Sequence, residues 1–136
     1  MSTELDREEF KNQALKRDKH RCVFCGEKTG VTVHHILDRK LWPDRGGYYL
    51  SNAATVCEKH HWQTELTNLS VDEVRKAAKI ECPELPPGFD PANAYDKWGN
   101  TIMEDGSRVA GPLFHDDGCQ KALKAGHKLN LFYGSI

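Results

Sequence analysis

The stretch Leu50-Ser-Asn-Ala-Ala-Thr-Val-Cys-Glu-Lys-His-His61 joins a β-type run to a segment that carries two adjacent histidines. Residues 53–56 predict a short strand, and we expect a helix from Glu58 to about Asn68. An earlier run, Val31 to Leu37, is rich in β-branched residues and follows turn-forming glycines, which predicts the partner strand. The expected order of elements is therefore strand, loop, strand and helix.

Two pairs of possible metal ligands flank these elements. Cys22 and Cys25 form a Cys-x-x-Cys knuckle, and Cys57 and His60 repeat that spacing where the predicted helix begins. Two close pairs of thiolate and imidazole ligands are typical of tetrahedral zinc. Four protein ligands leave no open position, so we expect a structural Zn²⁺ that ties the first turn to the later helix. The alternative is that the cysteines are buried thiols that only fill the core.

Three histidines interleave with the zinc ligands. His34 and His35 are neighbours in the first predicted strand, and His61 is turned by about 100° from His60 on the predicted helix. Because neighbouring strand residues point to opposite faces, we expect His34 and His35 to have different roles. One of them, with His61, can hold a divalent cation that keeps open positions, while the other accepts a proton from water. Asn52 is either a functional support for this site or an ordinary turn residue.

In these residues the chain resembles the HNH endonucleases, in their version with a zinc-binding knuckle. The resemblance covers Arg21 to Glu65 and is carried by Val33-His-His-Ile36 and by the stretch quoted first. Two differences stand out. His60 replaces the usual cysteine of the second knuckle, and the positions where a basic residue often follows hold Gln63, Thr64 and Glu65.

The resemblance implies a role for each polar residue of the motif. His34 and His61 would bind one catalytic divalent cation, Mg²⁺, Mn²⁺ or Ni²⁺, and His35 would be the general base. Asn52 would act indirectly, because its amide would bond to backbone across the hairpin and keep His35 aimed at the water. The implied catalytic set is therefore His35, Asn52, His34 and His61.

The resemblance also implies a fold and an activity. We expect an α+β protein with a ββα-metal, treble-clef-like core, flanking short helices and a C-terminal hairpin or extended arm. The implied reaction is hydrolysis of DNA phosphodiester bonds to 5′-phosphate and 3′-hydroxyl ends, by nicking or double-strand cleavage, in a monomer or homodimer. Two alternatives stay open: a zinc-stapled nucleic-acid-binding module that does not cut, and a nuclease for RNA or structured DNA within a larger complex.

Local signals outside the motif divide the chain into 1–81, the nuclease core, and 82–136, a Pro-rich linker with an appendage packed on the core. Asp6 and Glu9 predict a helix that runs to about His20, and Ser70-x-x-Glu73 is a capping box. Four prolines and a glycine crowd residues 83–91, and Asp105-Gly106 predicts a hairpin. A short helix is expected from Cys119 to Ala125, and we predict Trp62 to be a core residue.

Composition limits the ways in which the chain can bind nucleic acid or a membrane. With 19 Lys and Arg against 20 Asp and Glu, the net charge of −1 argues against a broad basic face. Five basic residues remain possible phosphate contacts: Lys19, Arg21, Arg39, Lys40 and Arg45. A solvated helix face explains Lys19 and Arg21 equally well. No apolar leader or membrane-spanning run is visible, so we expect a cytoplasmic protein without membrane contact. Cys82 and Cys119 are expected to be free thiols.

Overall fold

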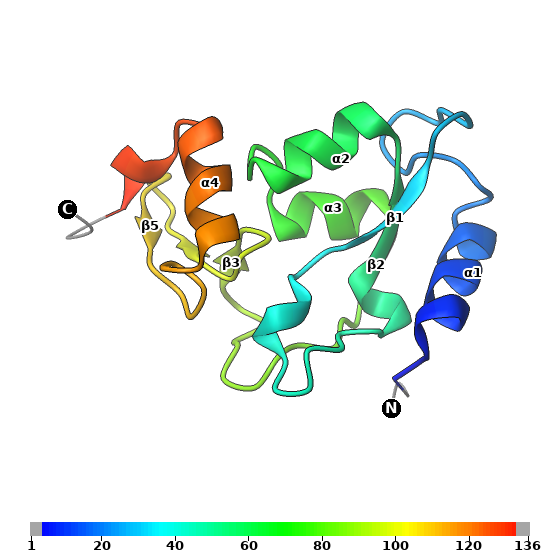
Figure 1. The fold of residues 1–136 in the computed structure, drawn as a ribbon, viewed down its shortest axis with the longest axis horizontal. Helices are drawn as coiled ribbons and strands as arrows, with labels where there is room; N and C mark the ends of the chain where they lie inside the picture. Colours follow the sequence, from blue (N-terminus) through cyan, green and yellow to red (C-terminus); the bar gives the residue numbers. More distant parts are fainter. Residues whose placement is uncertain (1–3, 133–136) are drawn as a thin grey trace.

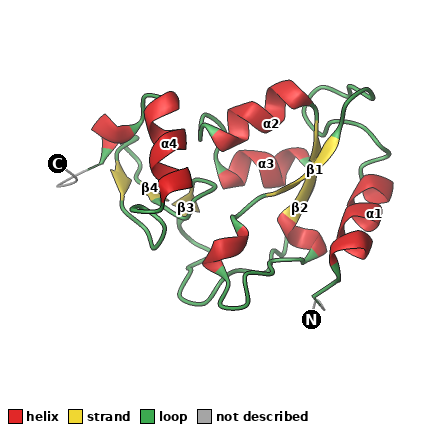
Figure 2. Ribbon diagram, viewed as in Figure 1, coloured by secondary structure: helices red, strands yellow, loops and turns green. Residues whose placement is uncertain are grey.

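The computed structural model describes residues 4–132 and has an α+β architecture (Figures 1 and 2). Its helices are α1 (Arg7–Arg17), α2 (Glu58–Glu65), α3 (Val71–Ala77) and α4 (Asp117–Ala125). One antiparallel sheet pairs β1 (Thr32–His35) with β2 (Ala53–Val56). A second contains β3 (Ala94–Tyr95), β4 (Thr101–Ile102) and β5 (Arg108–Val109) in that order. Figure 1 shows the first sheet among α1, α2 and α3, with the second sheet and α4 at the opposite end of the molecule.

The β1–β2 pair is covered on both faces, which explains why every residue of β2 is buried. On one face Ala53 packs with Phe10 and Ala14 of α1. On the other, Ala54 belongs to the main core with residues of α3 and of the segment after β1. His35 pairs with Ala53 and His34 with Ala54. Since directly paired residues share a face of the sheet, the register places His35 toward α1 and His34 on the opposite face.

Side-chain caps fix where α1 and α3 begin. The Asp6 carboxylate accepts a 2.8 Å hydrogen bond from the Glu9 amide, and Ser70 and Glu73 form the predicted reciprocal capping box. Helix α1 ends at Arg17, before the predicted His20, because Lys19 and His20 have φ angles of 57° and 55°. Such left-handed backbone cannot continue a right-handed helix.

The C-terminal segment contains the predicted hairpin and helix, and one strand that was not predicted. Strand β3 follows the Pro-rich stretch and pairs with β4. Its Tyr95 joins the main core, together with the half-buried Leu85 and Phe89. Beyond β3 the segment has an apolar cluster of its own, made by Trp98, Phe114, Cys119, Leu123 and Phe132. None of the helices in the described part of the chain is long and apolar enough to cross a membrane.

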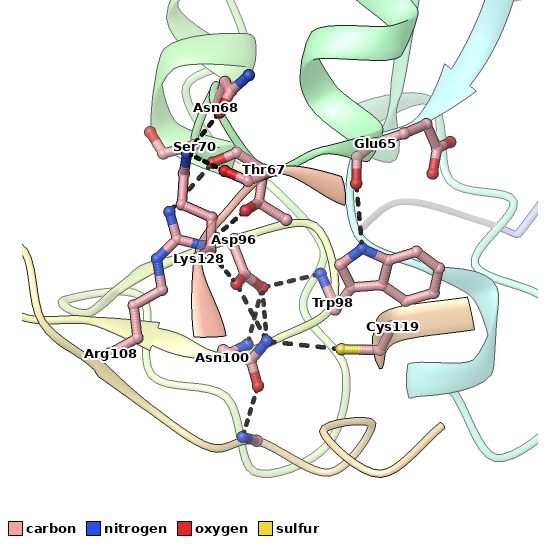
Figure 3. A network of polar contacts seen from close by, with 12 residues as sticks. Glu65, Thr67, Asn68, Ser70, Asp96, Trp98, Asn100, Arg108, Cys119 and Lys128 are labelled. Carbon is pink, nitrogen blue, oxygen red and sulfur yellow. Dashed lines mark hydrogen bonds and ion pairs between the residues drawn. The ribbon is translucent and has the colours of Figure 1, made fainter. Parts of the chain in front are cut away.

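A buried polar network joins the second sheet to the loop between α2 and α3 (Figure 3). Asp96 is fully buried and accepts hydrogen bonds from the amides of Trp98 and Asn100, each at 3.0 Å. Arg108 lies 3.0 Å from the Asp96 carboxylate and donates to the Thr67 hydroxyl at 2.7 Å. Burial raises the pKa of Asp96, while the Asn100 hydrogen bonds and the charge of Arg108 oppose that rise. Charge pairing and hydrogen bonds therefore offset part of the cost of removing this carboxylate from water.

Arg108→Met is expected to destabilise the protein by about 3–5 kcal/mol, because it leaves Asp96 buried without its counter-charge. Urea unfolding measures the change. The matched control is Lys40→Met, since Lys40 forms an exposed ion pair with Asp116 at 3.0 Å, and such pairs contribute about 1 kcal/mol or less. Equal losses in the two variants would contradict this account of the network.

Candidate metal centres

Cys22, Cys25, Cys57 and His60 converge as the spacing predicted, in a cluster that can hold a structural metal such as zinc. The sulfurs of Cys25 and Cys57 are 3.8 Å apart, and the Cys22 sulfur is 3.5 Å from His60 Nδ1. Zinc–sulfur bonds of about 2.3 Å in a tetrahedron give sulfur–sulfur separations of about 3.8 Å. The spacing of the donor atoms therefore fits tetrahedral zinc with no position left for substrate.

Local backbone structure brings the two ligand pairs together. The Gly26 amide bonds to the Cys22 carbonyl at 2.9 Å, and Gly26 has a φ of 76°, which a glycine adopts without strain. The Val23 amide bonds to the Thr55 carbonyl, so the knuckle is attached to β2. Cys57 is the N-cap residue of α2, and it places His60 on the first turn of that helix.

A second group of possible metal ligands lies beside β1 and contains His34, His61 and Glu65. Glu65 Oε1 is 3.1 Å from His61 Nε2 and 3.9 Å from His34 Nδ1. His61 and Glu65 are four residues apart on α2, which places them on one face of the helix. Two imidazoles and one carboxylate suit transition metals and leave coordination positions for water and substrate.

Electrostatics favour the ionisation states that bind a cation. Burial, followed by the charge of Lys97, lowers the pKa of His34 well below its usual value. Burial alone would raise the pKa of Glu65, but the hydrogen bond from His61 and the nearby Lys97 ammonium hold it at about 2. At neutral pH His34 is therefore neutral and Glu65 is ionised.

His35 lies on the α1 side of the sheet, as the register requires. Its ring stacks on Phe10 with centroids 4.5 Å apart and meets the edge of Tyr48 at 5.1 Å. Burial, then the charges of Arg39 and Lys97, lower the pKa of His35 to about 4. Its Nε2 is buried and has no hydrogen-bond partner in the described range. His35 lines the same hollow, of about 240 Å³, as His34, His61 and Glu65.

Asn52 is fully buried and makes the backbone hydrogen bonds expected of it. Its Oδ1 accepts from the Leu37 amide at 2.9 Å, and its Nδ2 donates to the carbonyls of Leu37 at 3.1 Å and Gly47 at 3.2 Å. Asn52 therefore clamps the chain that leaves β1 to the loop that returns toward β2. This position lets it act on the histidines through the backbone.

The five predicted phosphate contacts separate into different surroundings. Arg39 lines the hollow of the histidines and also a groove of about 670 Å³ between α1 and β1. Arg45 is exposed and its carbonyl accepts from Arg39 Nε, whereas Lys40 pairs with Asp116. Lys19 lines a separate hollow together with Ala78. Arg21, two residues after Lys19 in the chain, is exposed.

Several residues of this region were not predicted from the sequence. Arg7 and Lys11 of α1 line the groove with Arg39, and Lys97 lines the hollow of the histidines. Glu65 could have been found from the sequence, because a residue four positions after His61 lies on the same face of the predicted helix and can be a third metal ligand. Lys97 lies 36 residues beyond His61 and had no such signal.

The prediction that Trp62 is a core residue is wrong, because 58% of its surface is exposed. His61 and Glu65 face β1, and Trp62 is rotated by about 100° from His61 on the helix. It lines an open hollow beside Cys25 and Cys57. Of the two unassigned cysteines, Cys82 is exposed and Cys119 is buried, both as free thiols.

The chain matches no protein-family profile, no curated protein and no solved structure.

Cys25→Ser is expected to reduce the bound zinc from about one per chain to a small fraction, because it removes one of four thiolate or imidazole ligands. Atomic emission measures the metal, and thermal unfolding should show a lower Tm. Cys25 is exposed, so the exchange leaves no apolar cavity that would explain a loss of stability. Cys82→Ser, at the other exposed cysteine, is the control. Equal zinc in both variants would count against the site.

Proposed function

We propose that the protein is a metal-dependent endonuclease of the HNH type, with β1, β2 and α2 as its ββα-metal core. The observation that supports this most directly is that His34, His61 and Glu65 line one hollow with His35. A structural zinc knuckle has no need of these four residues. They combine a cation site that has open positions with a neutral imidazole beside it, which is what hydrolysis of a phosphodiester requires.

The residues of the second cluster would hold the divalent cation. When bound, the cation supplies Lewis-acid stabilisation of negative charge on the phosphate and on the departing 3′ oxygen. Its ligands include nitrogen donors, so we expect Mn²⁺ or Ni²⁺ to support activity as well as Mg²⁺. The four ligands of the first cluster would hold zinc and take no part in the chemistry.

His35 would take the proton of the attacking water. Its low pKa keeps the imidazole neutral at pH 7 and therefore able to accept a proton. The charges that lower this pKa belong to Arg39, Lys97 and Arg7. A phosphate bound among these cations would offset their charges and move the pKa of His35 upward, toward the range in which a general base is effective. Substrate binding would thus strengthen the base.

The groove between α1 and β1 is the best-placed surface for the rest of the substrate. Arg7, Lys11 and Arg39 line it, against one acidic side chain, Glu8. Three cations can position a phosphate backbone without reading its sequence. DNA is the proposed substrate, with RNA as the other nucleic acid that this surface would accept, and the products would carry 5′-phosphate and 3′-hydroxyl ends.

His35→Ala is expected to slow cleavage by about 10²–10⁴-fold, the usual contribution of a general base. The assay follows supercoiled plasmid and labelled RNA with Mg²⁺, Mn²⁺, Ni²⁺ or EDTA. His115→Ala is the matched control, because His115 is exposed and lies in the C-terminal segment. If the zinc-loaded wild-type protein cuts neither substrate with any cation, the nuclease is excluded and a non-cutting binding module becomes the better proposal.

Glu65→Ala is expected to weaken Mn²⁺ binding by at least about tenfold, since it removes one of three protein ligands. Isothermal titration calorimetry on zinc-loaded protein measures the affinity. Glu58→Ala is the control, because Glu58 is an exposed acidic residue on the first turn of the same helix. Equal affinities in the two variants would remove Glu65 from the proposed ligand set.

A further inference from the structure

The C-terminal segment reaches the hollow of the histidines through Lys97, which follows β3 by two residues. The Lys97 ammonium lies 2.8 Å from Glu65 Oε2 and 4.2 Å from the centre of the Trp98 ring. Only 11% of the Lys97 side chain is exposed. An ammonium group this far from water needs a partner of opposite charge, and Glu65 provides it.

The two oxygens of Glu65 have different partners. Oε1 faces the imidazoles, at 3.1 Å from His61 Nε2 and 3.9 Å from His34 Nδ1. Oε2 accepts the hydrogen bond from Lys97. A carboxylate can bind a cation through one oxygen or both. With Oε2 bonded to an ammonium, Oε1 is the oxygen available to a cation between the histidines.

The backbone around Lys97 is held from two sides. Its carbonyl accepts a 3.0 Å hydrogen bond from the Asp38 amide, just beyond β1. The indole of Trp98 donates to the Glu65 carbonyl at 3.4 Å, at the end of α2. Figure 3 shows the Trp98 indole nitrogen directed at the Glu65 carbonyl. Asp96, which precedes Lys97 in the chain, belongs to the buried network. Lys97 is therefore fixed in place before any cation or substrate binds.

A purely structural tie would not need this location. Lys40 and Asp116 already form an ion pair between the chain after β1 and the C-terminal segment, with 41% of the Lys40 side chain exposed. Lys97 ties the same C-terminal segment to α2, is far less exposed than Lys40, and pairs with a candidate metal ligand. The difference in surroundings points to a role at the metal site.

We propose that Lys97 is a positioning residue that restricts Glu65 to one metal-facing oxygen. The restriction keeps coordination positions on the divalent cation open for water and a phosphate oxygen. It also gives the C-terminal segment a function, because that segment completes the site. The inference rests on the proposed nuclease site, and it concerns how the ligands of that site are held.

The test compares Mn²⁺ bound to the wild-type protein, Lys97→Met and Lys97→Arg. Water-proton relaxation reports how many exchangeable waters stay on the bound ion. In Lys97→Met both oxygens of Glu65 become free to bind, so we expect about one fewer water and cleavage reduced by about 10–100-fold, the usual effect of losing a residue that orients a ligand. Lys97→Arg keeps a donor on Oε2 and should retain the wild-type water number. Methionine keeps an unbranched side chain next to Trp98, and zinc content confirms that each variant is folded.

Lys121→Met, at an exposed lysine of α4 to which no role is assigned, is the control and should leave both the water number and cleavage unchanged. An unchanged water number in Lys97→Met overturns the inference, and a lower Tm accompanying that result would identify Lys97 as a structural tie. Absence of Mn²⁺ binding in the wild-type protein overturns it as well. A failure of the proposed nuclease would look different. The wild-type protein would bind Mn²⁺ and Lys97→Met would show one fewer water on the ion, yet the wild-type protein would cut no nucleic acid.

Discussion

The pairing of β1 with β2 is the constraint on which the candidate site depends. Helices and core residues cover both faces of the pair, so its register decides on which face each histidine lies. A slip of one residue would exchange the surroundings of His34 and His35. Two features oppose such a slip. The knuckle is bonded to β2 through Val23 and Thr55, and Asn52 holds the chain beyond β1 to the loop before β2.

The accuracy of the sequence-based predictions depended on the range of the interaction. The two pairs of possible metal ligands, the two strands and the capping box of α3 each have a local pattern with spacings of two to four residues, and the structure contains all of them. The exposure of Trp62 depends on which face of α2 meets β1, and spacing alone does not settle that face. Lys97 approaches Glu65 through the packing of a distant segment, which no local pattern describes.

The C-terminal segment combines apolar packing with charge pairing. Tyr95 places one end of it in the main core, while Arg108 connects the second sheet to Thr67 through buried hydrogen bonds. Apolar contacts tolerate small shifts, but the Arg108 guanidinium bonds to Asp96 and Thr67 at fixed distances. Such a network favours one arrangement of the segment over its alternatives more than it adds to stability. A single arrangement is also what a lysine directed at one carboxylate oxygen requires.

The two ligand groups meet at neighbouring residues, His60 and His61, on the first turns of α2. In the proposed enzyme these two metals would differ greatly in how long they stay. Zinc enclosed by four protein ligands would exchange slowly and act as a permanent part of the fold, whereas a cation on three ligands with open positions would come and go with the supply in solution. A shortage of zinc during folding would leave α2 without its anchor and His61 without a fixed direction. The capacity to cut would then be set when the chain folds, and the activity at any moment by the more mobile ion.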